Sequence, residues 1–190
     1  AADLAVHTAL DAQARRIIDQ ADITYATSFT WDCTASVWEQ ILDRPLLMGA
    51  LWTAYGFAPA YQVSSRGDTL HVDDPTGLVG DALLFRRRWG ERAYLIHGKL
   101  DHWAVPFFNK GIAVIVLKSR PEGDRIAGDL RVYVRAGSTL GNIVLKVGRK
   151  LLYDHVDNRV TLNLQDTRKI VETIDADPAQ IAARLRGAEA

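Results

Sequence analysis

The sequence has few of the residues that build disulfides, metal clusters or strongly charged surfaces. Its 190 residues include one cysteine, Cys33, which excludes an internal disulfide, a Cys-ligated zinc site and an iron–sulfur cluster. Lysine and arginine together number 23, as do aspartate and glutamate, so the formal net charge is zero. Because nucleic-acid binding requires a basic excess, this balance argues against nucleic acid as a partner.

Motifs that carry catalysis or bind cofactors are absent as well. The sequence contains no glycine-rich phosphate loop, no nucleophile elbow and no His-Glu-x-x-His metalloprotease motif. We therefore expect no bound metal, no cofactor and no catalytic residue of those types. Cys33 comes just before an expected helix start, where a thiol pKa can fall. No histidine partner is evident, so we interpret Cys33 as an ordinary buried thiol.

One long uncharged run raises the question of a membrane span. Residues 45–65 carry no charge over 21 positions, and a spanning helix needs about 20 predominantly apolar residues. This run is broken by Gly49, Gly56 and Pro59, so we interpret it as a buried helix, Leu46–Tyr55, followed by a strand, and we expect a soluble protein. The Ala-Ala-Asp start is compatible with signal-peptide cleavage, and so with a periplasmic or secreted protein, and equally with a cloning boundary.

What is present is a hydrophobic content of 48% arranged in periodic patterns. Helical spacing predicts a helix over Leu4–Ala21 and another over Ala35–Leu42, on either side of a strand over Ile23–Trp31. From Ala60 to Arg135 the pattern is strand and turn. The best-marked strands are Gly80–Arg88, Arg92–Trp103, Ile112–Ser119 and Arg125–Arg135. Their alternation predicts an antiparallel sheet with one dry face and one wet face.

The residues after the sheet supply a cover for its dry face. Apolar positions recur at helical spacing from Leu140 to Ile174, which predicts one long helix of roughly 50 Å. We expect a bend or break near Asn158–Asn163 because that length is unusual in a soluble domain. A short last helix is predicted over Ala179–Arg186.

This order of elements resembles the helix-grip fold of the START-like (SRPBCC) superfamily. The superfamily includes START lipid-transfer domains, polyketide cyclase/aromatase-like proteins, coenzyme Q-binding proteins and Bet v 1 allergens. The local matches are the strand-to-helix step Trp31–Trp38, the hairpin Ile112–Arg135 and the closing helix. The resemblance implies an α+β protein in which a curved antiparallel β-sheet wraps around a long C-terminal helix. Residues 23–174 would form this domain, with an N-terminal helix extension at 1–22 and a short C-terminal helix extension at 175–190.

The resemblance further implies a cavity between the sheet and the last helix that takes lipids, sterols, quinones or polyketides. A curved sheet gripping a helix leaves an interior gap for a hydrophobic ligand, unless large side chains fill it completely. We expect the ligand to contact apolar and aromatic residues of both layers. These candidates are Phe85, Tyr94, Ile96, Val114 and Val132 on the sheet, and Val144, Val147, Leu151 and His155 on the helix.

Two polar candidates and one aromatic loop complete the expected site. If Phe85 faces inward, Arg87 does too, and it would pair with a protein carboxylate, meet an acidic ligand head group or lie at the rim. His102 lies near the end of a predicted strand and could face the ligand. In the connection after that strand, Trp103, Phe107 and Phe108 would gate the cavity and make transient membrane contact, or pack inward as core.

The sequence favours a non-enzymatic binder or transporter of a hydrophobic small molecule over an enzyme. The alternative is a polyketide cyclase/aromatase-like enzyme, which needs polar cavity groups that move a proton. Arg87, His102, His155 and the tyrosines are the candidates for that role. A third reading is an interaction module, which would show a solid core beside a large exposed apolar patch.

Overall fold

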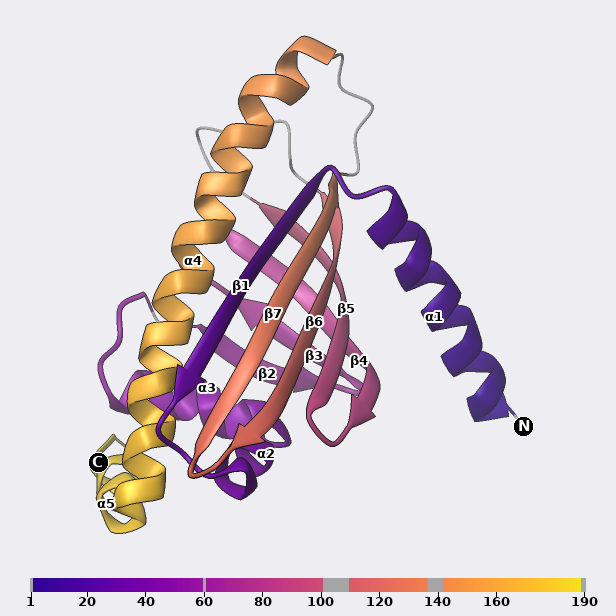
Figure 1. The fold of residues 1–190 in the computed structure, drawn as a ribbon. Coiled ribbons are helices and arrows are strands. Elements are labelled where there is room, and N and C mark those ends of the chain that lie inside the picture. The colour runs from indigo at the N-terminus through magenta and orange to yellow at the C-terminus, as the bar shows by residue number, and fades with distance from the viewer. Residues whose placement is uncertain (1, 60, 101–109, 137–141, 189–190) are drawn as a thin grey trace.

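The computed structural model describes residues 2–59, 61–100, 110–136 and 142–188 (Figure 1). Its helices are α1 (Ala2–Asp19), α2 (Ala35–Leu42), α3 (Pro45–Ala54), α4 (Asn142–Ala176) and α5 (Pro178–Ala188). Its strands are β1 (Ile23–Trp31), β2 (Gln62–Arg66), β3 (Thr69–Asp73), β4 (Leu78–Arg88), β5 (Glu91–Leu100), β6 (Gly111–Glu122) and β7 (Arg125–Ala136). Within these residues no helix is both long enough and apolar enough to cross a lipid bilayer.

The strands form one antiparallel sheet in the order β1-β7-β6-β5-β4-β3-β2. Strands β2 to β7 follow one another as a meander, and β1 adds to the far edge beside β7. The sheet curves without closing, and α4 runs along its concave face (Figure 1). The predicted α+β fold class, a curved antiparallel sheet around a long C-terminal helix, is confirmed.

The long helix is continuous, so of the bend or break expected near Asn158–Asn163 the break is wrong. The helix spans 35 residues, about 52 Å at a rise of 1.5 Å per residue. From Arg149 to its end it contains neither glycine nor proline, the residues that most often interrupt a helix. Packing against β1, α2 and α5 supports its length.

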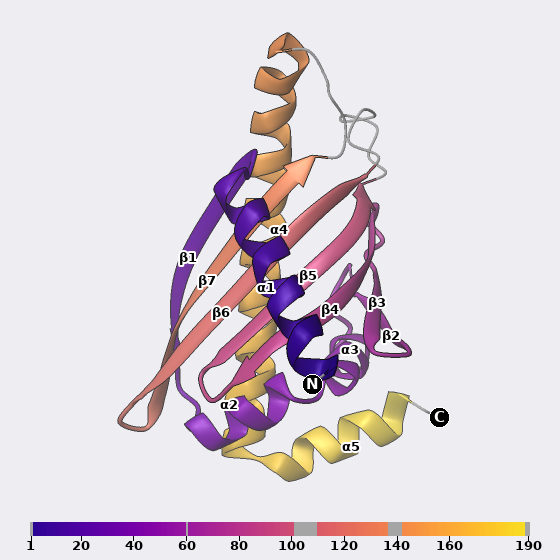
Figure 2. The ribbon, with the colours of Figure 1, turned by 90° about the vertical axis from the view of Figure 1, so that its right-hand side faces the viewer.

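The convex face of the sheet is covered in part by α1, which crosses it at an angle (Figure 2). Ala14 and Ile17 of this helix are buried against Phe85, Leu95 and Val114 of the sheet. An ion pair joins the same layers, because the guanidinium of Arg86 lies 2.7 Å from the carboxylate of Asp11. The expectation of one wholly wet face is therefore wrong where α1 lies.

A second buried cluster closes the end of the concave side that α2 covers. Trp31 and Trp38 meet edge to face with ring centroids 5.2 Å apart, and Leu51, Ile170 and Val171 are almost fully buried with them. The start of α2 is set by Thr34, whose hydroxyl accepts the backbone N–H of Val37 and donates to the carboxylate of Asp175. This cluster joins β1, α2, α3, α4 and α5, and it stands at one end of the space between the sheet and α4.

Candidate functional site

A pocket of about 480 Å³ lies between the concave face of the sheet and α4. This volume falls within the range of small-molecule sites in proteins, about 300–1,000 Å³. The described residues therefore leave space where a tightly packed interior would have none.

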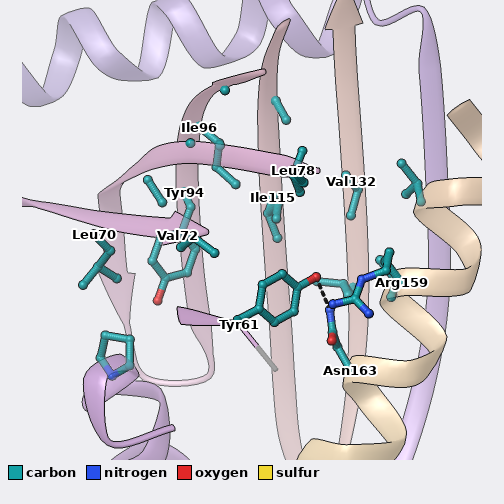
Figure 3. A pocket seen from close by; sticks show the side chains of 18 of the residues that line it. Tyr61, Leu70, Val72, Leu78, Tyr94, Ile96, Ile115, Val132, Arg159 and Asn163 are labelled. Carbon is teal, nitrogen blue, oxygen red and sulfur yellow. Dashed lines mark hydrogen bonds between the residues drawn. The ribbon is translucent and has the colours of Figure 1, made fainter. Parts of the chain in front are cut away.

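Strand alternation builds the sheet wall of this pocket. Side chains two residues apart point to the same face, and the pocket-facing set is almost entirely aliphatic (Figure 3). Tyr94 and Ile96 come from β5, Ala113 and Ile115 from β6, and Leu130, Val132 and Val134 from β7. The opposite wall is α4, which contributes residues at helical spacing: His155, Val156, Arg159, Val160, Asn163, Leu164 and Thr167.

The remaining walls come from both edges of the fold. Leu70 and Val72 of β3 and Leu78 of β4 extend the apolar lining (Figure 3). The helical end is formed by β1, α2 and α3 through Trp31, Trp38, Ile41, Leu42, Pro45, Met48 and Trp52. Lys99 and Lys110 also border the pocket, and both are exposed to solvent.

Three polar residues, Tyr61, Arg159 and Asn163, meet in this apolar lining. Together with Asp74, the buried partner of Arg159, we call them the polar corner. The Nε of Arg159 donates to Oδ2 of Asp74 at 2.8 Å, and both side chains are buried. The Nδ2 of Asn163 donates to the hydroxyl of Tyr61 at 2.5 Å. The Arg159 guanidinium lies 4.8 Å from the centroid of the Tyr61 ring. Figure 3 shows Arg159 and Asn163 reaching from α4 toward Tyr61.

The polar corner has no net charge, and both carboxylate oxygens of Asp74 accept hydrogen bonds. Asp74 is fully buried, and its second oxygen accepts the backbone N–H of Thr76 at 2.9 Å in the turn between β3 and β4. A buried charge without a partner would cost several kcal/mol, and the ion pair between Arg159 and Asp74 gives each buried charge a partner. Burial raises the pKa of the Tyr61 hydroxyl, with the hydrogen bond from Asn163 opposing the rise. The hydroxyl therefore stays protonated at neutral pH.

Several of the predicted site residues line the pocket. Tyr94, Ile96 and Val132 do so from the sheet, and His155 does so from α4. Burial raises the pKa of the Tyr94 hydroxyl. These four positions are brought together around one space, as the helical and strand periodicities require.

Other predicted site residues lie elsewhere, and their placement corrects the sequence analysis. Phe85 and Val114 are buried on the convex face against α1. Phe85 faces the convex side by regular alternation, because Leu83 pairs with Leu95 there. A bulge between Leu84 and Arg86 then shifts the register, so Arg87 faces the opposite side from Phe85. Arg87 lies outside the pocket, with its side chain 62% exposed, and pairs with Asp43 at 2.5 Å. This is the protein-carboxylate alternative for Arg87.

The last group of predicted residues comes from the start of α4 and the connection before β6. Leu151 is 40% exposed and does not appear in the pocket lining. Val144 and Val147 lie in α4, but their side chains are not among those described. His102, Trp103, Phe107 and Phe108 lie outside the described residues, so their predicted roles stay predictions.

The sequence analysis missed the polar corner. Its members are far apart in the chain, with Asp74 and Arg159 separated by 85 residues and Tyr61 and Asn163 by 102. One signal was present, because Arg159 and Asn163 follow His155 at intervals of four along the face of the helix that carries the apolar stripe. A charged residue on a buried helix face needs a partner, which the sequence alone could not identify.

Two further buried residues, Arg92 and Cys33, resemble functional residues but have structural explanations. Arg92 is almost fully buried, but it donates to Glu39 at 2.8 Å and to Asp43 at 2.6 Å, so it joins α2 to the sheet. Cys33 is fully buried, and burial, with Asp175 nearby, raises its thiol pKa to about 12. It is therefore the unreactive thiol that we expected. The described residues hold no cluster of three or more potential metal-ligating side chains.

Comparisons with known proteins find this fold, but no relative by sequence. No protein-family model matches the chain, and neither does any curated protein. A conserved protein from Geobacillus kaustophilus superposes with a TM-score of 0.59 at 12% identity, covering 80% of this chain and 97% of that one. A START superfamily protein from Mycobacterium smegmatis gives 0.52 at 13% identity, covering 80% and 98%.

An enzyme with the same architecture is similar to a comparable degree. Norcoclaurine synthase from Thalictrum flavum, solved in complex with dopamine and hydroxybenzaldehyde, gives a TM-score of 0.53 at 11% identity, covering 78% of this chain and 86% of that one. At these identities the likeness shows the fold alone. The protein thus has the START-like, Bet v 1-like helix-grip fold that the order of its elements suggested.

Proposed function

We propose that this protein binds a hydrophobic small molecule in the pocket between the sheet and α4. The observation that carries the proposal is the pocket itself: a volume of about 480 Å³ whose lining is apolar except for a few polar groups. Such a combination is typical of small-molecule sites, where apolar walls supply affinity and a few polar groups fix orientation. The fold supports the proposal, since the similar synthase was solved with small aromatic molecules bound.

Simple arithmetic supports useful affinity for an apolar ligand. Removing about 200 Å² of apolar ligand surface from water contributes roughly 5 kcal/mol at 25 cal/mol per Å². The walls are set by strands and a continuous helix, so little ordering is needed when a ligand enters. Lipids, sterols, quinones and polyketides all fit this description, and the class of ligand is taken further below.

The arrangement favours binding over catalysis. A cyclase needs a group that takes or gives a proton at the ligand. In the polar corner both oxygens of Asp74 already accept hydrogen bonds from Arg159 and Thr76, and the pKa of Tyr61 is raised. These groups can hold a ligand but are poorly suited to act as a base. We therefore propose a binder or carrier, with the gate at Trp103, Phe107 and Phe108 and transient membrane contact as further predictions.

The proposal is tested by filling the pocket. The neutral dye N-phenylnaphthylamine fluoresces when it enters an apolar site, and we expect saturable binding to the purified protein. Ala113 lines the pocket from the middle of the sheet, so Ala113→Trp should weaken dye binding by at least about tenfold. Ala26 is an exposed residue of β1, and the matched substitution Ala26→Trp should leave binding unchanged.

The same experiment can contradict the proposal. Absence of saturable dye binding, or equal binding by the Ala113→Trp and Ala26→Trp proteins, would show that the pocket is not the site. A complementary measurement is to incubate the protein with lipid extract and identify co-purifying molecules by mass spectrometry. The Ala113→Trp protein should retain less of them than the Ala26→Trp protein.

A further inference from the structure

The polar corner offers hydrogen-bond donors to the pocket, and its buried acceptor is already occupied. A guanidinium carries five N–H groups. Arg159 uses one on Asp74 and one on the backbone carbonyl of Pro59, at 2.8 and 3.4 Å. Arg159 also hydrogen-bonds to the Tyr61 side chain. These three bonds use three of the five N–H groups, so two donors are left. Arg159 lines the pocket, so these donors are available to a ligand there.

Tyr61 adds a donor of the same kind. Its oxygen accepts the hydrogen bond from Asn163, and the described part of the chain provides no acceptor for its own proton. Tyr61 also lines the pocket, and Figure 3 shows its hydroxyl turned toward Arg159 and Asn163. Two donors from different elements, a segment before β2 and the middle of α4, therefore meet at one edge of an apolar space.

The charge of this corner restricts what those donors can hold. Arg159 brings one positive charge and Asp74 one negative charge, at 2.8 Å and both buried. An anionic ligand group placed here would add a charge that nothing in the ion pair is free to balance. Burying an uncompensated charge is far more costly than burying a hydrogen-bonded neutral group. The other cations that border the pocket, Lys99 and Lys110, are exposed and screened by water and salt.

We infer that the ligand is a neutral, oxygen-bearing hydrophobe whose hydroxyl or carbonyl oxygen accepts hydrogen bonds from Arg159 and Tyr61. Long-chain alcohols, ketones, quinones and sterols belong to this class. Free fatty acids and other lipid anions do not. This inference rests on the proposed function and refines it, because it selects among hydrophobic ligands by the charge and hydrogen-bonding capacity of one end.

The test compares ligands that share a chain and differ in one end group. Lauryl alcohol, laurate and dodecane compete for bound N-phenylnaphthylamine at about pH 8, where the carboxylate is ionised. We expect lauryl alcohol to compete at least about tenfold more strongly than laurate and several-fold more strongly than dodecane. Laurate competing as well as the alcohol would overturn the inference.

Two variants locate the effect at the polar corner. Tyr61→Phe should weaken the binding of lauryl alcohol about threefold to tenfold and leave the binding of dodecane unchanged, because only one hydrogen bond is lost. The matched control is Tyr133→Phe, since Tyr133 packs with the cluster under α1. A Tyr61→Phe effect of equal size on alcohol and alkane would assign Tyr61 a packing role and count against the inference.

A charge change gives the sharpest test. Asp74→Asn keeps an acceptor for Arg159 but leaves its positive charge unbalanced. Laurate should therefore compete for the dye site at least about tenfold more strongly than with the wild-type protein, and about as strongly as lauryl alcohol. An unchanged order of the two ligands in a folded Asp74→Asn protein would overturn the inference. If this variant does not fold, the wild-type and Tyr61→Phe measurements decide the matter.

Failure of this inference is distinguishable from failure of the proposed function. If the pocket does not bind hydrophobic molecules, N-phenylnaphthylamine itself will not bind saturably, and both proposals fall. If the dye binds and Ala113→Trp removes it, while alcohol and laurate compete equally, the binding function stands and the selectivity for neutral ligands is wrong.

Discussion

The two faces of the sheet are built from the same strands but differ in packing. On the convex face, Leu95 is 2% exposed and Ala93 and Val114 are fully buried under α1. On the concave face, Ile96, the next residue after Leu95, borders a pocket. The comparison shows that strand alternation lets one face supply packing while the other borders an open pocket.

Two buried arginines, Arg92 of β5 and Arg159 of α4, differ in their partners. Arg92 donates to two carboxylates, Glu39 and Asp43, and to the backbone carbonyls of Arg88 and Glu91. Arg159 has one carboxylate partner, Asp74, and keeps donors toward the pocket. Arg92 is therefore held between two carboxylates as part of the scaffold, whereas Arg159 is held by one carboxylate and borders the pocket.

The largest expected effect concerns this scaffold role. Arg92→Met removes the partner of Glu39, which is itself buried, and leaves a buried carboxylate unbalanced. We expect the free energy of unfolding to fall by about 3–5 kcal/mol in urea titrations. Arg87→Met, which alters an exposed pair with Asp43, should change it by less than about 1 kcal/mol. Similar values for the two variants would remove the distinction between them.

The next effect separates the faces directly. Leu95→Ala creates a cavity under α1 and should lower the free energy of unfolding by about 2–5 kcal/mol. Ile96→Ala enlarges a space that already exists, so we expect no more than about half that loss. Urea titrations of the two neighbouring variants measure the difference. Equal losses would mean that the pocket face is packed as tightly as the convex face.

The smallest effect tests how α1 is held. Arg86 and Asp11 form an ion pair at 2.7 Å, with side chains 32% and 36% exposed. Solvent screens such a pair, so Arg86→Gln should cost only about 0.2–1 kcal/mol. A loss as large as that of Leu95→Ala would indicate that α1 is attached by charge and not by apolar burial. Binding of N-phenylnaphthylamine should not change in this variant, because Arg86 lies outside the pocket lining.

Local signals in the sequence predicted much of the fold. The strand Ile23–Trp31 and the helix Ala35–Leu42 begin and end where they were expected, since alternation marks the one and Thr34 caps the other. The short strands Gln62–Arg66 and Thr69–Asp73 were placed only within a general run of strand and turn. Their partly exposed residues give little alternation to detect.

The errors have physical causes as well. Phe85 was assigned to the wrong face because alternation alone does not tell which face of β4 is concave, and the bulge between Leu84 and Arg86 then puts Phe85 and Arg87 on opposite faces. The residues at the bulge itself include no glycine, proline, asparagine or aspartate that would indicate it. The burial of Val114 on the convex face was hidden because α1 makes both faces of the sheet apolar there. The polar corner depends on contacts across 85 and 102 residues, which periodicity cannot reveal.

The placement of α1 has a consequence for how such a pocket can change over time. Because the convex face carries an apolar cluster of its own, part of the free energy of folding comes from residues outside the pocket. Under the proposed function, substitutions at Ile96 or Ala113 should then alter ligand preference with a modest loss of stability. A protein built in this way is a suitable starting scaffold for laboratory redesign of ligand selectivity, one strand position at a time.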